Sequence, residues 1–321
     1  MKPCPADTLN VDLLGVSYLL NICRLVSIEV GVSVEREQPA DFGHKVGARM
    51  RIGPRRRKFR DLLRRGDLWG YYLESELVLR TCLRRTLPSP RFVIFAQGRT
   101  GSRLLCELLD SHSGIDCDFE MLADPVRDVH RYVRNLAPAS IRPAYGFKVK
   151  IYQLKHRHGI GDSATFLRQL HEQDWRIINL KRRNLFRQVY SGLARQVRGK
   201  AHSRPLSDGS APVPPSVSLD VAEIVRLIRL RQKMLRRERR ALKGLPVKTL
   251  VYEDDLFQPL DQQRTAHNIV EWLGLTPEPV HTDMIPNTPR NLRDVIANFD
   301  EVEAALRGTE FETFFAEATG A

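Results

Sequence analysis

The segment RFVIFAQGRTGSRLLCELLDSH, residues 91–112, begins with an apolar run and continues into a stretch with helical spacing. The run over 92–96 predicts a buried strand. The second stretch predicts a helix over 102–109, whose inner side carries four leucines: Leu104, Leu105, Leu108 and Leu109. A buried strand that leads directly into a helix is the repeating unit of a parallel α/β sheet.

Six residues connect the strand to the helix: Gln97, Gly98, Arg99, Thr100, Gly101 and Ser102. The two glycines permit backbone conformations that turn successive N–H groups inward, and a helix start adds unpaired donors and a positive dipole end. Arg99 and Arg103 add full charges, while Thr100 and Ser102 add hydroxyl donors. The combination predicts an anion-binding loop, and an ordinary strand-to-helix turn with two glycines is the alternative.

This loop differs from the two common nucleotide-binding motifs. The pattern GxxxxGK followed by Ser or Thr is absent, because no Lys precedes the hydroxyl that leads the helix. No acidic residue clearly ends a strand in the manner of a Walker-B motif, and GxGxxG is also missing. A P-loop kinase is therefore the weakest hypothesis, and we expect a phosphate loop of another kind.

From residue 91 onward, short apolar runs alternate with helical stretches. The pattern predicts an α/β, P-loop-like three-layer sandwich around a mainly parallel sheet, with an irregular, partly helical extension over 1–90 before a domain over 91–321. A segment rich in Ser, Pro and Gly, 200–218, predicts a mobile loop. The predicted strands are 92–96, 115–119, 145–151, 176–181 and 247–252, and the predicted helices 102–109, 126–135, 163–173, 184–197, 219–242 and 260–273.

The net charge of +13 is uneven: +6 over 1–90, +10 over 91–200 and −3 over 201–321. A basic domain suits nucleic acid, lipid headgroups or a small polyanionic ligand. The nucleic-acid hypothesis lacks aromatic interleaving, a helix-turn-helix and a zinc pattern, so we expect no nucleic-acid partner.

Cysteine usage and hydropathy indicate the redox environment of the protein and its relation to membranes. The five cysteines form no CxxC pair and no Cys/His zinc spacing, which predicts a reducing, cytoplasmic environment and no metal. The most apolar long segment, 11–33, contains Asp12, Arg24 and Glu29, so we expect no transmembrane span. Peripheral contact with a membrane stays open.

A second basic element follows the fourth predicted strand. Every fourth residue from Arg183 onward is polar, and Arg183, Arg187, Ser191 and Arg195 are expected on one helix face. Like charges at this spacing repel unless an anion binds there. Loops that follow parallel strands open at one edge of the sheet, so this element and the 97–102 loop should converge. Two anion sites at one edge suit a bisphosphorylated nucleotide.

These residues resemble the sulfotransferases that use 3′-phosphoadenosine 5′-phosphosulfate (PAPS), in particular the bacterial and carbohydrate-acting branch, from about residue 91 to 275. The resemblance implies that QGRTGSR, residues 97–103, holds the 5′-phosphosulfate. It also implies that Arg183 and Ser191, which are eight residues apart, hold the 3′-phosphate. The Arg-Lys-Gly loop that completes this site in the family has no literal counterpart, and Arg293 or Arg290 is the candidate to replace it. The segment that starts VYEDD at Val251 is similar to the YEDL segment of the family.

Glu120, at the end of the second predicted strand, is the candidate general base. A short right-handed crossover brings that strand end close to the 97–102 loop. Asp116, Asp118 and Glu120 are expected on one strand face, and only Glu120 clears the sheet edge. Members of the bacterial branch are similar, with a Glu in this place, and a helix-capping Glu is the alternative.

Two lysines and one arginine complete the predicted catalytic group. Lys148 and Lys150 alternate with apolar residues, so both should lie on one face of a buried strand. The resemblance implies that Lys148 stabilises the transferred group, and a structural ion pair is the alternative. Arg99 would neutralise charge on the leaving 5′-phosphate. The expected reaction moves a sulfuryl group from PAPS to an acceptor hydroxyl, on a carbohydrate or glycolipid. The long basic helix near 221–243 is a solvated face, or a surface for an anionic acceptor or a membrane.

Overall fold

The structure, a computed structural model, describes residues 70, 72–74, 77, 88–137, 140, 142–198, 216–284, 288–289 and 291–320. The chain divides into two compact units, 1–83 and 84–321, and the account below concerns the second. Most of the predicted extension over 1–90, most of the predicted mobile loop over 200–218, and Arg290 lie outside the described residues.

The second unit is built on a five-stranded sheet in which every strand is parallel to its neighbours. The strand order β2-β3-β1-β4-β5 places β1 at the centre, where its side chains from Phe92 to Ala96 are fully buried. This confirms the predicted α/β class. The strands are β1 (Arg91–Ala96), β2 (Ile115–Glu120), β3 (Ala144–Val149), β4 (Trp175–Lys181) and β5 (Val247–Val251).

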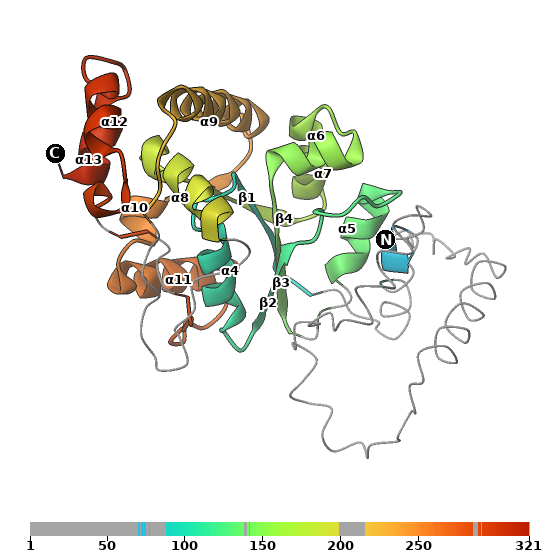
Figure 1. The fold of residues 1–321 in the computed structure, drawn as a ribbon. Helices are drawn as coiled ribbons and strands as arrows, with labels where there is room; N and C mark the ends of the chain where they lie inside the picture. Colours follow the sequence, from blue (N-terminus) through green and yellow to red (C-terminus); the bar gives the residue numbers. More distant parts are fainter. Residues whose placement is uncertain are drawn as a thin grey trace, which may run out of the picture. The chain divides into compact units, whose positions relative to one another are not determined.

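Helices cover both faces of the sheet, which gives the three layers (Figure 1). One face packs against α4 (Ser102–Asp110) and α11 (Pro259–Leu273), whose apolar sides share one core cluster with β1. The opposite face is covered by three helices: α5 (Val129–Leu136), α6 (Ile151–His158) and α7 (Ser163–Glu172). None of the described helices combines the length and apolar character that a membrane crossing requires.

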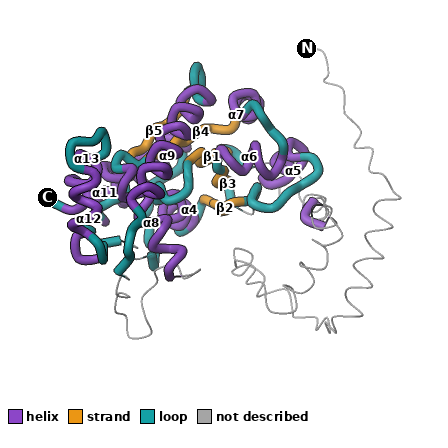
Figure 2. The backbone as a smooth tube through the Cα atoms, turned by 45° about the horizontal axis from the view of Figure 1, so that its top comes forward, coloured by secondary structure: helices purple, strands orange, loops and turns teal. Residues whose placement is uncertain are grey.

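A second apolar cluster lies beside the sheet and consists mainly of helices, joined by two extended segments that form the bridge between Val217 and Ile296. In it Phe186 contacts Phe315 edge-on, with ring centroids 5.1 Å apart. Figure 2 shows α9 alongside α8, where their contacts place it. The helices of this second cluster are α8 (Leu185–Arg198), α9 (Val221–Ala241), α12 (Phe299–Leu306) and α13 (Glu312–Thr319). The sequence patterns did not predict α12 and α13.

Two predictions were wrong in ways that matter for the site: the end of the third strand and the placement of Arg183 on a helix face. The third strand ends at Val149 rather than at residue 151, because Gln153 Oε1 accepts the backbone N–H of Lys150 at 2.8 Å and caps α6. α8 begins at Leu185, because Asn184 Oδ1 accepts the N–H of Arg187. Arg183 therefore precedes the helix and is not part of its polar face.

Candidate active site

A cavity of about 1000 Å³ lies at the carboxyl edge of the sheet. All five strands contribute to its lining at or just beyond their last residue, as expected for ligand sites of parallel sheets. The contributing residues are Gly98 after β1, Glu120 in β2, Lys148 and Lys150 at the end of β3, Arg182 after β4, and Tyr252 after β5.

The loop after β1 bends through two residues in the left-handed region. Arg99 has φ 70° and Gly101 has φ 84°, whereas Gly98 has no positive φ. The prediction that both glycines supply this conformation was therefore wrong for Gly98, because Arg99 adopts it instead. A backbone in which residues of positive and negative φ alternate turns its N–H groups toward one point. Gly101 caps α4 without a side-chain hydrogen bond, so the amides of the first helical turn stay available to an anion.

Some residues of this loop line the cavity, and others support the loop from the side away from the cavity. Gly98, Arg99, Gly101, Ser102 and Arg103 line the cavity. Thr100 and Gln97 are buried and support the loop from behind, since Thr100 Oγ1 donates to the Gln97 carbonyl at 3.0 Å. Arg103 Nε contacts Glu107 Oε1 at 3.1 Å.

The loop after β1 meets α8 directly, as the sequence predicted. The Arg99 guanidinium donates twice to Ser191 Oγ, from Nε at 3.0 Å and from Nη2 at 2.7 Å. Gln188 Nε2, one turn earlier on α8, donates to the Gly98 carbonyl at 2.8 Å. Ser191 and Arg195 both line the cavity, so a hydroxyl and a cation of α8 face the same space as the loop.

The other arginines of the predicted basic helix face, and Arg293, lie elsewhere. The half-exposed guanidinium of Arg183 pairs with Asp254, and its backbone N–H donates to Glu253. Arg187 is buried, where Nη1 donates to the Ala318 carbonyl. Arg293 stacks on Phe299, 4.2 Å from the ring centroid. Among the described residues, none of these three arginines lines the cavity.

Glu120 lies between two lysines. Lys148 Nζ is 3.0 Å from Oε1, and Lys150 Nζ is 2.5 Å from Oε2, which also accepts from Gln153 Nε2 at 3.0 Å. Both lysines are buried, so one carboxylate compensates two cations. The two lysines lie close together, as predicted, and the ion pair that was the alternative to a catalytic role for Lys148 is present.

A β-bulge places Glu120 in this cluster. Asp118 pairs with Phe147 in the ladder, and the next pair is Glu120 with Lys148, which leaves Phe119 unpaired. The bulge shifts the alternation by one residue, so Glu120 lies on the opposite face from Asp118. The expectation that Asp116, Asp118 and Glu120 share a face was wrong for this reason. Asp118 instead accepts the Tyr145 hydroxyl at 2.8 Å.

The two lysines determine the protonation of Glu120. Burial alone would raise the pKa of this carboxyl, but the charges of Lys148 and Lys150 outweigh burial and lower the pKa to about 2. Glu120 is therefore a carboxylate at neutral pH. It becomes an effective proton acceptor only when a lysine turns away from it.

Several cavity residues were not predicted, because contacts between distant segments bring them there. Arg182 is buried, donates from Nη1 to the Arg99 carbonyl at 3.2 Å, and stacks 4.7 Å from the centroid of Tyr252. It ties the ends of β4 and β5 to the loop after β1. Leu230, Arg231 and Met234 of α9 form another wall.

Behind that wall, a buried carboxyl connects α9 to the loop after β1. Gln97 Nε2 donates to Glu238 Oε2 at 3.2 Å. Burial raises the pKa of Glu238 to about 7, despite the lowering effect of Gln97 and of the Arg231 charge. Three buried atoms of this group have no hydrogen-bond partner among the described residues: Gln97 Oε1, Glu238 Oε1 and Arg231 Nε.

The raised pKa of Glu238 predicts a pH dependence of stability. The folded state binds its proton up to about pH 7 and the unfolded state only up to about 4.5, so stability falls as pH rises between these values. At about 1.36 kcal/mol per pKa unit, this loss is on the order of 3 kcal/mol. We expect Glu238→Gln to remove it, measured as the difference in unfolding free energy between pH 5 and pH 8 by urea denaturation. An equal loss in the variant and the native protein would contradict this assignment.

The described residues contain no group of three or more His, Cys, Asp or Glu side chains that could hold a metal ion.

No protein-family model and no curated protein matches the sequence. The solved structures that match include three sulfotransferases, each at low sequence identity. The protein from Alicyclobacillus acidocaldarius is 16% identical with a TM-score of 0.38, and the match covers 74% of this chain and 98% of that one.

Mouse SULT7A1, in complex with PAP, is 12% identical with a TM-score of 0.35, over 72% of this chain and 76% of that one. STF9 from Mycobacterium avium is 13% identical with a TM-score of 0.40, over 96% of this chain and 100% of that one.

Proposed function

We propose that this protein is a sulfotransferase that moves a sulfuryl group from PAPS to an acceptor hydroxyl, on a carbohydrate or glycolipid. The supporting observation is that two basic, hydroxyl-bearing elements and a Lys-Glu-Lys cluster line one cavity. One element is the loop that includes Arg99 and Ser102, and the other is the α8 face with Ser191 and Arg195. A donor with phosphates at both ends of its nucleoside requires two such elements.

The loop after β1 suits the phosphosulfate end of the donor. Its backbone amides and the first turn of α4 offer donors to the 5′-phosphate, and Ser102 adds a hydroxyl in the proposed role. The Arg99 guanidinium would neutralise the charge that develops on this phosphate as it leaves. Ser191, next to Arg99, and Arg195 would contact the 3′-phosphate. Arg183 would join them by exchanging Asp254 for the phosphate, and Arg293 by leaving Phe299.

The transfer step uses the cluster around Glu120. The acceptor O–H bond breaks and its proton moves to a Glu120 carboxylate oxygen, while the acceptor oxygen forms a bond to sulfur. The bond between sulfur and the 5′-phosphate oxygen breaks, and its electron pair leaves with 3′,5′-bisphosphoadenosine. Lys148 would contact the sulfuryl oxygens. A lysine that moves from Glu120 to the donor also raises the pKa of Glu120, so donor binding would prepare the base.

Nucleotide binding tests the donor site. At a concentration 100 times Kd, 3′,5′-bisphosphoadenosine is expected to stabilise the folded protein by about 2.7 kcal/mol. At roughly 2–4 °C per kcal/mol, this is a rise in Tm of about 5–10 °C, measured by scanning fluorimetry. Arg183→Ala is expected to remove most of this rise.

Arg307→Ala is the matched control, because Arg307 is also exposed and also forms a surface ion pair, with Glu303. It should leave the rise in Tm unchanged. The absence of any rise in the folded native protein would contradict the proposed donor. A full rise in Arg183→Ala would contradict only the role of Arg183.

A further inference from the structure

The long helix α9 borders three adjoining hollows. Its residues Leu230, Arg231 and Met234 form a wall of the main cavity. A second hollow, of about 500 Å³, shares Leu230 with that cavity and is lined also by Lys233 and Arg236. A third, of about 330 Å³, shares Met234 and is lined also by Arg237 and Arg240. A ligand that leaves the main cavity along α9 in either direction therefore meets cations.

Most of these cations have no acidic partner. Arg226 and Arg229 are paired, with Glu223 and Glu310. Five exposed cations in the second half of α9 form no ion pair with any described residue: Lys233, Arg236, Arg237, Arg239 and Arg240. We call these five residues the α9 cations.

The α9 cations repel one another. Lys233 and Arg237, like Arg236 and Arg240, are four residues apart on adjacent turns, where like charges are destabilising. The carbonyl end of the helix dipole offsets part of the repulsion for the last turn only. A polyanion on this face would offset the remainder, and guanidinium groups match carboxylate and sulfate oxygens in two-point hydrogen bonds.

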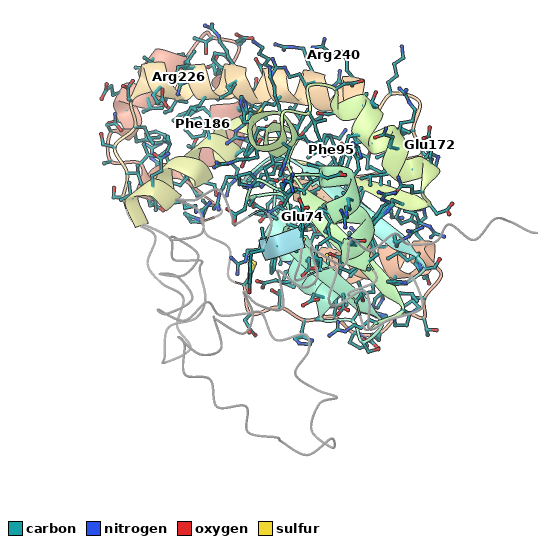
Figure 3. All side chains as sticks on the ribbon, turned by 90° about the vertical axis from the view of Figure 1, so that its right-hand side faces the viewer. Glu74, Phe95, Glu172, Phe186, Arg226 and Arg240 are labelled. Atoms are coloured by element: carbon teal, nitrogen blue, oxygen red, sulfur yellow. The ribbon has the colours of Figure 1, made fainter. Side chains whose placement is uncertain are left out.

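We propose that the α9 cations bind an anionic polysaccharide that is also the acceptor, so that one of its hydroxyls enters the main cavity. This inference rests on the sulfotransferase function proposed above. Figure 3 shows Arg226 and Arg240 toward opposite ends of α9, a distance of about 21 Å at 1.5 Å per residue. The hollows that follow this helix fit an extended chain.

Two other polyanions fit less well. Single-stranded nucleic acid binds through bases stacked on aromatic side chains, and α9 itself carries none, so Tyr152 and His156 are the only aromatic side chains among the described residues that line the second and third hollows. An anionic membrane presents a plane, whereas four of the five α9 cations line hollows beside the main cavity. A polysaccharide also supplies the hydroxyl that the proposed reaction needs.

Binding of a heparin-derived decasaccharide tests the proposal. The variant Lys233→Ala/Arg236→Ala/Arg237→Ala is compared with Arg131→Ala/Arg134→Ala/Arg168→Ala, which removes the same charge from exposed positions on α5 and α7. Affinity, measured by fluorescence anisotropy, should fall at least tenfold in the α9 variant and less than twofold in the control. Affinity for 3′,5′-bisphosphoadenosine should stay the same in both, which also shows that both are folded.

Equal losses in the two variants would overturn the proposal, because total charge would then explain the binding. Tighter binding of a 20-nucleotide DNA, or of phosphatidylserine vesicles, than of the decasaccharide would also overturn it. If the native protein fails to bind the bisphosphonucleotide, the sulfotransferase function falls on its own. The α9 surface is then judged by the difference between the two variants alone.

Discussion

Glu120→Gln is expected to lower kcat for sulfuryl transfer about 10²- to 10⁴-fold, the usual contribution of a positioned general base. The amide keeps the shape of the side chain but accepts no proton from the acceptor. It also leaves Lys148 and Lys150 without their shared carboxylate. The measurement is kcat with labelled PAPS and a panel of glycan and lipid acceptors, together with the affinity for 3′,5′-bisphosphoadenosine, which should change little.

Asp118→Asn is the matched control, because it neutralises a carboxylate on the same strand. The bulge at Phe119 turns Asp118 to the other face of the sheet, where it accepts the Tyr145 hydroxyl. We expect this variant to lose some stability but to keep kcat within a few-fold of the native value. Equal losses of kcat in the two variants, or full activity in Glu120→Gln, would mean that another group removes the proton.

Gly101→Ala is expected to disrupt the loop after β1. The residue has φ 84°, and a Cβ at this position would lie 2.4 Å from Cδ2 of Tyr252. Overpacking of this kind costs roughly 1–3 kcal/mol, and the left-handed conformation adds about 1 kcal/mol. The loop must then move away from Tyr252, which displaces the backbone N–H groups proposed to bind the 5′-phosphate. We expect a loss of bisphosphonucleotide affinity of 100-fold or more, measured by calorimetry.

Gly98→Ala tests whether the backbone conformation, rather than any added methyl group, causes the loss. A Cβ at Gly98 would meet only Tyr152 and Lys150, at 3.9 Å and 4.0 Å, which are ordinary contacts. This variant should keep stability and nucleotide affinity close to the native values. If Gly98→Ala lowers nucleotide affinity as much as Gly101→Ala does, the left-handed backbone at Gly101 does not explain binding.

The fold was largely predictable because its signals are local. Buried parallel strands appear as short apolar runs, and all five were predicted to within two residues of their observed ends. The loop after β1 was recognisable from composition alone, since glycines, arginines and hydroxyls occur within a few residues. The meeting of this loop with Ser191 followed from the rule that loops after parallel strands share one edge.

The remaining features depend on contacts that no local pattern encodes. The bulge at Phe119 is defined by how β2 pairs with β3, so the strand sequence alone placed Glu120 on the wrong face. Arg183 was expected in the site from its spacing to Ser191, yet its pairing with Asp254 depends on where β5 ends. Arg231 and Met234 lie on α9, and only the packing of this helix against distant segments brings them to the cavity.

The buried hydrogen bond between Gln97 and Glu238 joins residues 141 positions apart. On one side of it begins the loop proposed to hold the donor, and on the other runs the helix proposed to hold the acceptor. Two ligands that act on one shared contact alter each other's affinity by the same factor. If the two proposed substrates both act on this contact, each would change the affinity of the protein for the other, and the size of that change would depend on the ionisation of Glu238.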